Sequence, residues 1–296
     1  MSDYTGAFNN YLGLFESYAG ERFASLPDDS AGSAKMLEAM KYSFSGGGKR
    51  IRPVLCLAFC EASGGNARDA LPFALALEMV HTYSLIHDDL PCMDDDDMRR
   101  GKPSSHIAFG EANALLAGDA LLTLAFGEAV AGGNNPAAKA EAVKILSDAA
   151  GYAGMIAGQV MDLENEKREA GIDDIRSTDE RKTGRLIRAA GLLGCTAAGA
   201  DRALTGAAEE YCGKVGLAFQ IVDDILDVTG SAAALGKNTG SDEKSGKSTY
   251  VSVLGLEKAK ELALSLTDEA LGALAVFGEK GEFLKQLAVN LSYREK

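Results

Sequence analysis

Apolar residues recur at three- and four-residue spacing through most of the chain, from about Lys35 to Leu291. This spacing places them along one face of an α-helix, and the alternating pattern of a half-buried strand is scarce. Proline is rare, with 6 residues, while many of the 34 glycines fall between the periodic segments, as at Gly46–Gly48. The pattern therefore predicts an all-α protein in which glycines separate long helices.

The same breaks do not mark domain boundaries. The sequence has no Ser/Pro-rich linker, no low-complexity tract and no repeat of about 30 to 45 residues. We therefore expect residues 1–296 to form a single large helical bundle. Many of the helical segments are rich in alanine and apolar nearly all round, which predicts burial by several neighbouring helices or by a second subunit.

Composition excludes several other classes of protein. Hydrophobic residues make up 46% of the chain, and no run approaches the roughly 18 apolar residues of a membrane span, so we expect a globular protein without a transmembrane segment. The N-terminus lacks the basic start and apolar stretch of a secretory signal, which predicts a cytoplasmic location. The 5 cysteines form no paired CxxC pattern, and the net charge of −13 argues against a nucleic-acid partner.

Two aspartate clusters interrupt this apolar pattern. The first has six acidic residues in the ten positions from Asp88 to Asp97. A helix leads into it, and His81 shares a face of that helix with Asp88, seven residues later. Pro91 then disfavours further helix and turns the chain.

The second cluster has a cleaner geometry. Gln220, Asp223, Asp224 and Asp227 stand at positions i, i+3, i+4 and i+7, so an amide and three carboxylates project from one stripe of a helix. The residues between them are apolar, so we expect the helix to be packed in a core. Buried like charges repel and raise one another's pKa, and a cation would relieve this repulsion.

Mg²⁺ is the natural cation for such a site, because it prefers oxygen ligands and takes one or two protein carboxylates together with substrate phosphates. A solvated acidic helix face is the alternative interpretation of either cluster alone. Two clusters, each beside an apolar helix and followed by basic residues, favour the metal site.

Basic residues that could bind phosphates occur in four segments: Gly46–Arg52, Arg99–Arg100, Arg181–Arg185, and Lys237 with Lys247. The first joins a glycine turn to three cations, and glycine turns free backbone N–H groups for anions. No Walker A pattern is present. Each segment alone resembles an ordinary surface, but their combination with the aspartates predicts a diphosphate site.

In combination, these motifs resemble those of bacterial-type farnesyl diphosphate synthases, members of the short-chain trans-isoprenyl diphosphate synthase family. The resemblance runs from about Gly46 to the C-terminus. It is carried by the motifs GGGKRIRP, HTYSLIHDDLPCMDDDDMRRGKPS, GQVMDL, KTGRLIRAAGLLG, AFQIVDDILD and LGK…GKSTY. Pro91 and Cys92 match the two-residue insertion in the first aspartate motif of the bacterial type.

The resemblance implies an isoprenoid synthase fold, a homodimer, and a central cavity between two aspartate-bearing helices. It implies about three Mg²⁺ ions, with Mn²⁺ as the alternative. Their ligands would be Asp88, Asp89, Asp94, Asp223, Asp224 and Asp227. The allylic diphosphate would contact Arg99, Lys182, Thr183, Gln220, Lys237 and Lys247. Isopentenyl diphosphate would contact Lys49, Arg52, His81 and Arg100. The residues expected to carry catalysis are Asp88, Asp94, Lys182 and Asp223.

The implied reaction is ionisation of an allylic diphosphate, condensation with isopentenyl diphosphate and loss of a proton. Tyr83 lies five residues before Asp88, about 7 Å along the helix, where its ring could close the cavity. Together with Ser84 it favours farnesyl diphosphate as the product, with geranylgeranyl diphosphate as the alternative. A class I terpene cyclase and an inactive helical partner subunit are further alternatives, but a cyclase needs no isopentenyl site.

Overall fold

The structure is a computed structural model that describes residues 4–133, 135–229 and 248–293. Helices form nearly all of it, which confirms the expected all-α class. They are α1 (Tyr4–Ala24), α2 (Ala31–Phe44), α3 (Ile51–Ala62), α4 (Ala67–Asp88), α5 (Ser105–Phe109), α6 (Glu111–Ala131), α7 (Pro136–Ala150), α8 (Met155–Asn165), α9 (Ile172–Asp179), α10 (Arg185–Ala198), α11 (Arg202–Thr229), α14 (Tyr250–Leu254), α15 (Leu256–Ala273) and α16 (Glu282–Ser292). A π-helical turn, η1 (Glu180–Gly184), precedes α10, and a 3₁₀ segment, η2 (Leu274–Gly281), precedes α16.

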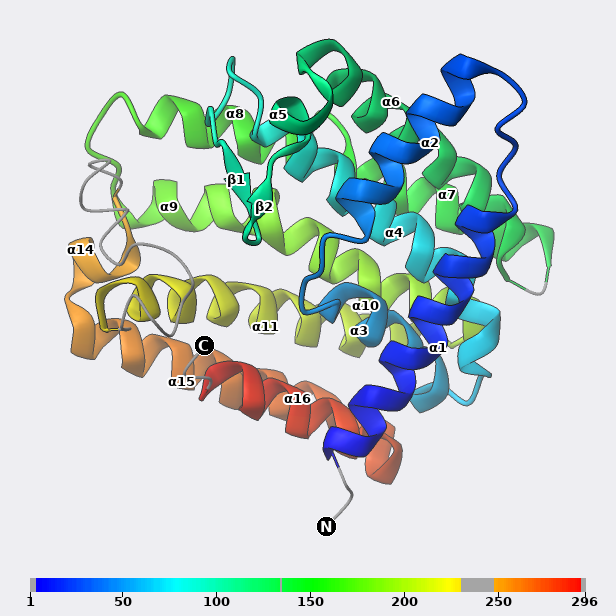
Figure 1. The fold of residues 1–296 in the computed structure, drawn as a ribbon. Helices are drawn as coiled ribbons and strands as arrows, with labels where there is room; N and C mark the ends of the chain where they lie inside the picture. The colour runs from blue at the N-terminus through cyan, green and yellow to red at the C-terminus, as the bar shows by residue number, and fades with distance from the viewer. Residues whose placement is uncertain (1–3, 134, 230–247, 294–296) are drawn as a thin grey trace.

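Helices α3, α4 and α10 form the centre of the bundle (Figure 1). Helix α4 packs against α3, α6 and α10, and most of its residues are buried. Helix α10 packs in turn against α3, α7 and α11. Such helices have few polar positions because neighbours cover them on several sides, which accounts for their nearly uniform apolar sequences.

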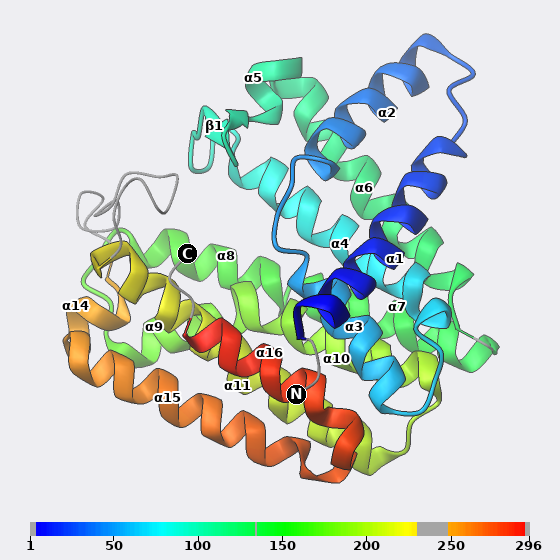
Figure 2. The same ribbon diagram turned by 60° about the horizontal axis from the view of Figure 1, so that its bottom comes forward.

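The first and last described helices, α1 and α16, lie side by side (Figures 1 and 2). The rings of Tyr4 and Phe283 stack with centroids 5.6 Å apart, and Tyr11 meets Phe283 edge-on at 5.1 Å. Aromatic pairs at these distances add to the burial of apolar area. Segments nearly the whole chain apart are thereby fixed to one side of the bundle.

A second, smaller hydrophobic core supports the helix that carries the later aspartates. Ile221 and Val222 of α11 are buried with Tyr250 of α14 and Leu266 of α15. Figure 2 shows α14 and α15 alongside α11. Apolar residues hold this side of α11 against the protein, so its other side can carry charge.

The chain turns sharply after α4, as Pro91 predicts. The helix ends at Asp88, and the backbone N–H of Asp94 returns to the carbonyl of Asp88 at 2.9 Å. An antiparallel hairpin follows, β1 (Met98–Arg99) and β2 (Lys102–Pro103). The turn therefore brings Asp88 and Asp94 of the first aspartate cluster together.

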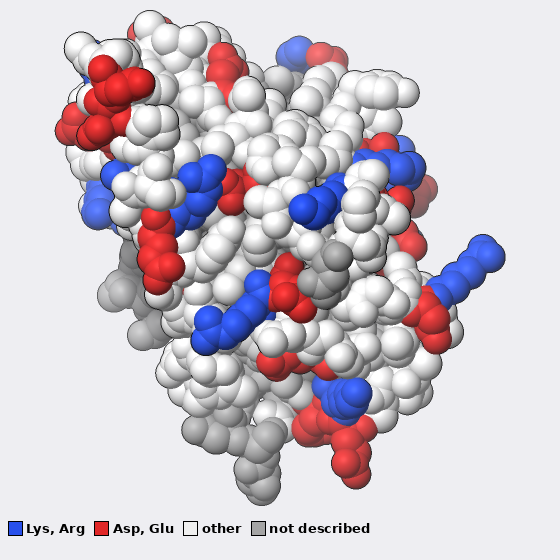
Figure 3. Space-filling view, turned by 90° about the vertical axis from the view of Figure 1, so that its right-hand side faces the viewer, with Lys and Arg blue, Asp and Glu red and all other residues white. Residues whose placement is uncertain are grey.

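Helix α6 is the one helix among the described residues with the length and apolar composition to cross a membrane. A core helix of a soluble protein passes the same test. Glu128 of α6 is 1% exposed and pairs with Arg22 of α1, and α6 also packs on α4. On the face of the molecule in Figure 3, the described basic side chains are interspersed with acidic ones around wide uncharged areas.

Candidate active site

A cavity of about 960 Å³ lies between the end of α4 and the second half of α11. This confirms the expected position of a central cavity between two aspartate-bearing helices. Its acidic lining residues are Glu78, Asp88, Asp94, Asp96, Asp162, Asp179 and Asp223. Its basic lining residues are Lys49, Arg50, Arg52, Arg99, Arg100 and Lys182. Such dense charge of both signs in one cavity suits a ligand with several phosphates bound through a cation.

The first aspartate cluster places two carboxylates in this cavity. Asp88 is the last residue of α4, and the turn after it carries Asp94 back to the same wall. Burial raises the pKa of Asp88 to about 6, and Lys182 and Arg99 oppose that shift only in part. Asp88 therefore lies where additional positive charge would stabilise its ionised form.

The donor set fits Mg²⁺ bound jointly by protein and substrate. Asp88, Asp94 and Asp223 supply the hard oxygen ligands that the ion prefers. Within residues 4–133, 135–229 and 248–293, no three carboxylate, imidazole or thiol side chains converge on one point. The remaining ligands would therefore be substrate oxygens and water, which is the usual arrangement for Mg²⁺.

Lys182 and Thr183 reach the cavity from the π-helical turn η1. The Nζ atom of Lys182 donates to Oδ2 of Asp162 at 2.6 Å, and Asp162 is 7% exposed. Helix α8 approaches η1 so closely that a Cβ on Gly158 would lie 2.2 Å from the backbone nitrogen of Lys182. π-Helical turns are frequent at functional sites because they redirect side chains.

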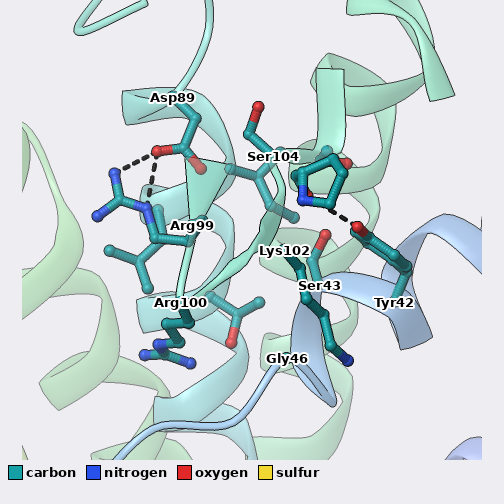
Figure 4. Close-up of a pocket in the computed structure, with 13 residues that line it drawn as sticks. Tyr42, Ser43, Gly46, Asp89, Arg99, Arg100, Lys102 and Ser104 are labelled. Atoms are coloured by element: carbon teal, nitrogen blue, oxygen red, sulfur yellow. Dashed lines mark hydrogen bonds and ion pairs between the residues drawn. The ribbon is translucent and has the colours of Figure 1, made fainter. Parts of the chain in front are cut away.

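Asp89 points away from the large cavity. The residue is 2% exposed, and its Oδ1 accepts from Nε of Arg99 at 2.8 Å (Figure 4). Both residues line a separate chamber of about 40 Å³ under the hairpin. Burial raises the pKa of Asp89, and the hydrogen bond from Arg99 opposes that rise.

The residues expected to bind isopentenyl diphosphate are brought together on one wall. Lys49, Arg52, His81 and Arg100 all line the large cavity. Burial and the surrounding arginines, Arg52 first, hold the pKa of His81 well below its usual range, so its imidazole is neutral. The guanidinium of Arg100 donates to the carbonyl of Gly47, and Figure 4 shows Arg100 pointing away from Asp89.

A second cavity of about 540 Å³ joins the first and is largely apolar. Asp88, Lys182 and Thr183 border both cavities. The apolar part is lined by Leu85, Met93, Leu122, Met155, Ile156, Val160, Leu163 and Leu186. A ligand with a charged head and a hydrocarbon tail would fit this pair of spaces.

Tyr83 and Ser84 also line the apolar cavity. Tyr83 is 5% exposed, and its ring meets that of His87 edge-on at 5.6 Å. Burial raises the pKa of Tyr83 to about 12, so the phenol is neutral. The hydroxyl of Ser84 donates to the carbonyl of His81 at 2.9 Å, within the helix.

The remaining predicted residues divide into three groups. Gln220 and Asp223 of α11 line the large cavity, whereas Asp224 and Asp227 do not. Asp224 instead accepts the backbone N–H of Tyr250 at 2.8 Å, which fixes the start of α14. Lys237 and Lys247 lie outside the described residues.

Four acidic residues that line the large cavity were not predicted as site residues: Glu78, Asp96, Asp162 and Asp179. Arg50 was expected only as one of the cations after the glycine turn, without a role of its own. Asp162 belongs to the GQVMDL motif and stands one helical turn after Gly158, and this pairing of a small residue with an acid was the available signal. For Glu78 and Asp179 the sequence offered none, because both come from segments that long-range packing brings to the cavity.

The sequence model for the polyprenyl synthetase family matches residues 33–277. The chain is 47% identical over 267 residues to farnesyl diphosphate synthase of Micrococcus luteus, covering 89% of this chain and 90% of that protein. It is 44% identical over 269 residues to the heterodimeric geranylgeranyl pyrophosphate synthase large subunit 1 of Arabidopsis thaliana, covering 88% and 72%.

A solved structure resembles the fold over nearly its full length. It is the geranyltransferase of Helicobacter pylori complexed with magnesium and isoprenyl diphosphate. The TM-score is 0.83 at 34% sequence identity, and the alignment covers 98% of this chain and 97% of that one.

Proposed function

The chain belongs to the polyprenyl synthetase family, and from this premise we propose that it condenses isopentenyl diphosphate with an allylic diphosphate to make farnesyl diphosphate. One observation carries the proposal. A cavity with acidic and basic walls opens into an apolar one, and Asp88, Lys182 and Thr183 stand where the two meet. A prenyl diphosphate has the matching division into an anionic head and a hydrocarbon tail.

The allylic diphosphate would lie with its head among Asp88, Asp94 and Asp223. Those carboxylates would hold Mg²⁺, which when bound supplies positive charge against the leaving diphosphate. Lys182 and Arg99 contribute fixed charge in the same cavity, and fixed donors stabilise developing negative charge without reorganisation. The allylic C–O bond can then break, with both electrons leaving on the diphosphate.

Isopentenyl diphosphate would bind on the wall of Lys49, Arg52, His81 and Arg100. Its double bond attacks the allylic carbocation and forms the new C–C bond, and the proton lost from the adjacent carbon passes to the released pyrophosphate. Positioning the two reactants side by side removes much of the entropic barrier. The apolar walls around Leu122 and Leu186 exclude water that would otherwise capture the cation.

Product length is decided in the apolar cavity. Tyr83 presents a buried aromatic ring there, one turn and a half before Asp88, and Ser84 lies beside it. A ring at that depth would stop a growing chain after the farnesyl unit. Geranylgeranyl diphosphate is the second candidate product, because one compared relative is a farnesyl and the other a geranylgeranyl synthase.

The proposal is tested by product analysis. Purified protein is incubated with dimethylallyl diphosphate, labelled isopentenyl diphosphate and Mg²⁺, and the dephosphorylated alcohols are separated by chain length. We expect mainly farnesol. Mainly geranylgeraniol would support the proposed reaction but contradict farnesyl diphosphate as its product. The absence of any elongated product would contradict both proposals. Products formed without isopentenyl diphosphate would indicate a cyclase.

Tyr83→Ala tests directly whether the Tyr83 ring limits the length of the product. Removing the ring opens the far end of the apolar cavity, so we expect products to shift from C15 towards C20, measured in the same assay. Tyr152→Ala is the matched control, because Tyr152 is 90% exposed and lines neither cavity. An unchanged C15 product from Tyr83→Ala would show that another residue limits the chain length.

A homodimer is the oligomeric state that we propose. Helix α6 exposes Leu115, Leu116 and Val130, and α8 exposes Ile156 and Val160. Both helices also contribute to the apolar cavity, α6 through Leu122 and α8 through Ile156 and Val160. Large exposed apolar side chains favour a subunit contact when they gather in one area. Light scattering coupled to size exclusion would give twice the 30.9 kDa chain mass for a dimer.

A further inference from the structure

Arg50 stands in sequence between two residues of the proposed isopentenyl diphosphate wall, Lys49 and Arg52, yet its guanidinium is buried in the protein. Its side chain is 3% exposed. Nε donates to Oε1 of Glu16 at 2.8 Å, and one terminal nitrogen donates to Oε1 of Glu78 at 2.9 Å. Two of the three guanidinium nitrogens are therefore engaged by carboxylates of the protein.

The third contact of Arg50 spans the glycine turn. Its other terminal nitrogen donates to the carbonyl of Phe44 at 2.6 Å, and the guanidinium carbon lies 4.8 Å from the centroid of the Phe44 ring. Phe44 ends α2, and Arg50 is the N-cap residue of α3. One side chain therefore ties together both ends of the turn that contains Gly46–Gly48 and Lys49.

The backbone of this turn needs such support. Arg50 has φ 49° and ψ 33°, a left-handed conformation that is unfavourable for a residue with a side chain. Gly47 and Gly48 also have positive φ, at 91° and 124°. Residues held in this region persist where surrounding contacts determine them, and they are common at ligand sites.

Glu78 extends the arrangement from Arg50 to the cavity. It is 2% exposed on α4, and its second oxygen, Oε2, is buried without a hydrogen-bond partner in the described chain. Nε of Arg52 is likewise buried and unpartnered there, and both residues line the large cavity. The Glu78 carboxylate thus bonds to Arg50 with one oxygen and lines the same cavity as Arg52.

We propose that Arg50, with Glu78, is a positioning residue for isopentenyl diphosphate. By fixing the glycine turn and the start of α3, it holds Lys49 and Arg52 in the places where they meet the diphosphate. The inference rests on the proposed function for the identity of that ligand. A purely stabilising role is the alternative, since removing a buried ion-pair partner destabilises proteins in general.

Steady-state kinetics separate the two roles. In Arg50→Met we expect KM for isopentenyl diphosphate to rise about tenfold or more, while KM for the allylic substrate changes less than about twofold. Arg50→Lys keeps the charge but reaches fewer of the three acceptors, so its KM should be intermediate. Arg50→Met with Glu78→Gln avoids a buried unpaired carboxylate and replaces the single variant if that one does not fold.

Arg22→Met is the matched control. Arg22 pairs with the buried Glu128 and lines neither cavity, so its removal also leaves a buried carboxylate unpaired. We expect Arg22→Met to lower Tm comparably and leave both KM values unchanged. Equal rises of both KM values in Arg50→Met, or a rise for isopentenyl diphosphate in Arg22→Met, would overturn the positioning role.

Calorimetric titration with isopentenyl diphosphate alone distinguishes failure of this inference from failure of the proposed function. Binding by the unaltered protein that weakens about tenfold in Arg50→Met supports the inference even if no elongation is found. Equal binding by both proteins overturns the inference but does not contradict the proposed elongation activity. No binding by the unaltered protein overturns the inference together with its premise.

Discussion

His81 shows how the charge of its neighbours determines the chemistry of a single side chain. Burial and four arginines, Arg52 and Arg100 foremost, lower its pKa well below the usual value of about 6.5. The imidazole therefore stays neutral at physiological pH and can offer one N–H donor to a diphosphate. The arginines, which do not titrate in this range, supply the positive charge of the wall.

A neutral donor can be replaced by another neutral donor. We expect His81→Gln to keep KM for isopentenyl diphosphate within about threefold of the unaltered protein, whereas His81→Phe, which has no donor, should raise it about tenfold or more. Both KM values are measured from about pH 6 to 8. If His81 instead bound the substrate in its protonated form, KM of the unaltered protein would change with pH over this range, and KM of His81→Gln would not.

The low pKa also has a consequence for folding. In the unfolded chain His81 binds a proton below about pH 6.5, whereas in the folded protein it does so only at much lower pH. The unfolded state therefore binds more protons in that window, and the free energy of unfolding falls as pH decreases below about 6.5. His81→Gln should lessen this fall, as measured by denaturant unfolding at pH 7 and pH 5.

At the scale of elements, the approach of α8 to η1 fixes the position of Lys182. Gly158 lies against the backbone of Lys182 and Arg181, and Asp162, one turn later on α8, binds the Lys182 ammonium at 2.6 Å. The backbone and the side chain of Lys182 are thus both set by one helix. A displacement of about 1 Å at such a site can cost about 100-fold in rate.

Gly158→Ala tests this contact. The added Cβ would lie 2.2 Å from the Lys182 nitrogen, so η1 must move, and we expect the turnover rate to fall about 100-fold. Gly20→Ala is the control, because Gly20 is exposed on α1 with nothing within 4 Å of the added Cβ. It should raise stability by about 0.5–1 kcal/mol and leave turnover unchanged. A fully active Gly158→Ala would show that the contact is dispensable.

At the scale of the whole molecule, sequence periodicity was sufficient to predict the helical class, whereas the cavity between the aspartate helices was implied by the family resemblance. Helical spacing also placed Gln220 and Asp223 together, since it depends only on residues close in sequence. Helical spacing does not indicate that Asp224 accepts the backbone N–H of Tyr250, nor the direction of Arg50, which follows from a left-handed backbone and contacts with three helices. Those outcomes depend on packing between segments far apart in the chain.

The proposed homodimer makes a prediction at the same scale. Leu116 is 52% exposed on the apolar surface of α6, and Leu116→Lys would place a charge in the subunit contact. We expect this variant to have the mass of one chain. Val253→Lys, at a 43% exposed apolar position on α14, should keep the mass of the unaltered protein. Dimers of Leu116→Lys at low micromolar concentration would place the contact elsewhere.

Two neighbouring residues of the hairpin, Arg99 at the end of β1 and Arg100 in the turn after it, have separate attachments. Arg99 is bonded to Asp89 behind the aspartate cluster, and Arg100 is bonded to the carbonyl of Gly47 in the glycine turn. The proposed contacts to the two substrates are thereby one peptide bond apart. If binding of one diphosphate changes the affinity for the other through this hairpin, the second must change the affinity for the first by the same factor. The hairpin therefore provides a short covalent path by which the two proposed diphosphate sites can influence one another.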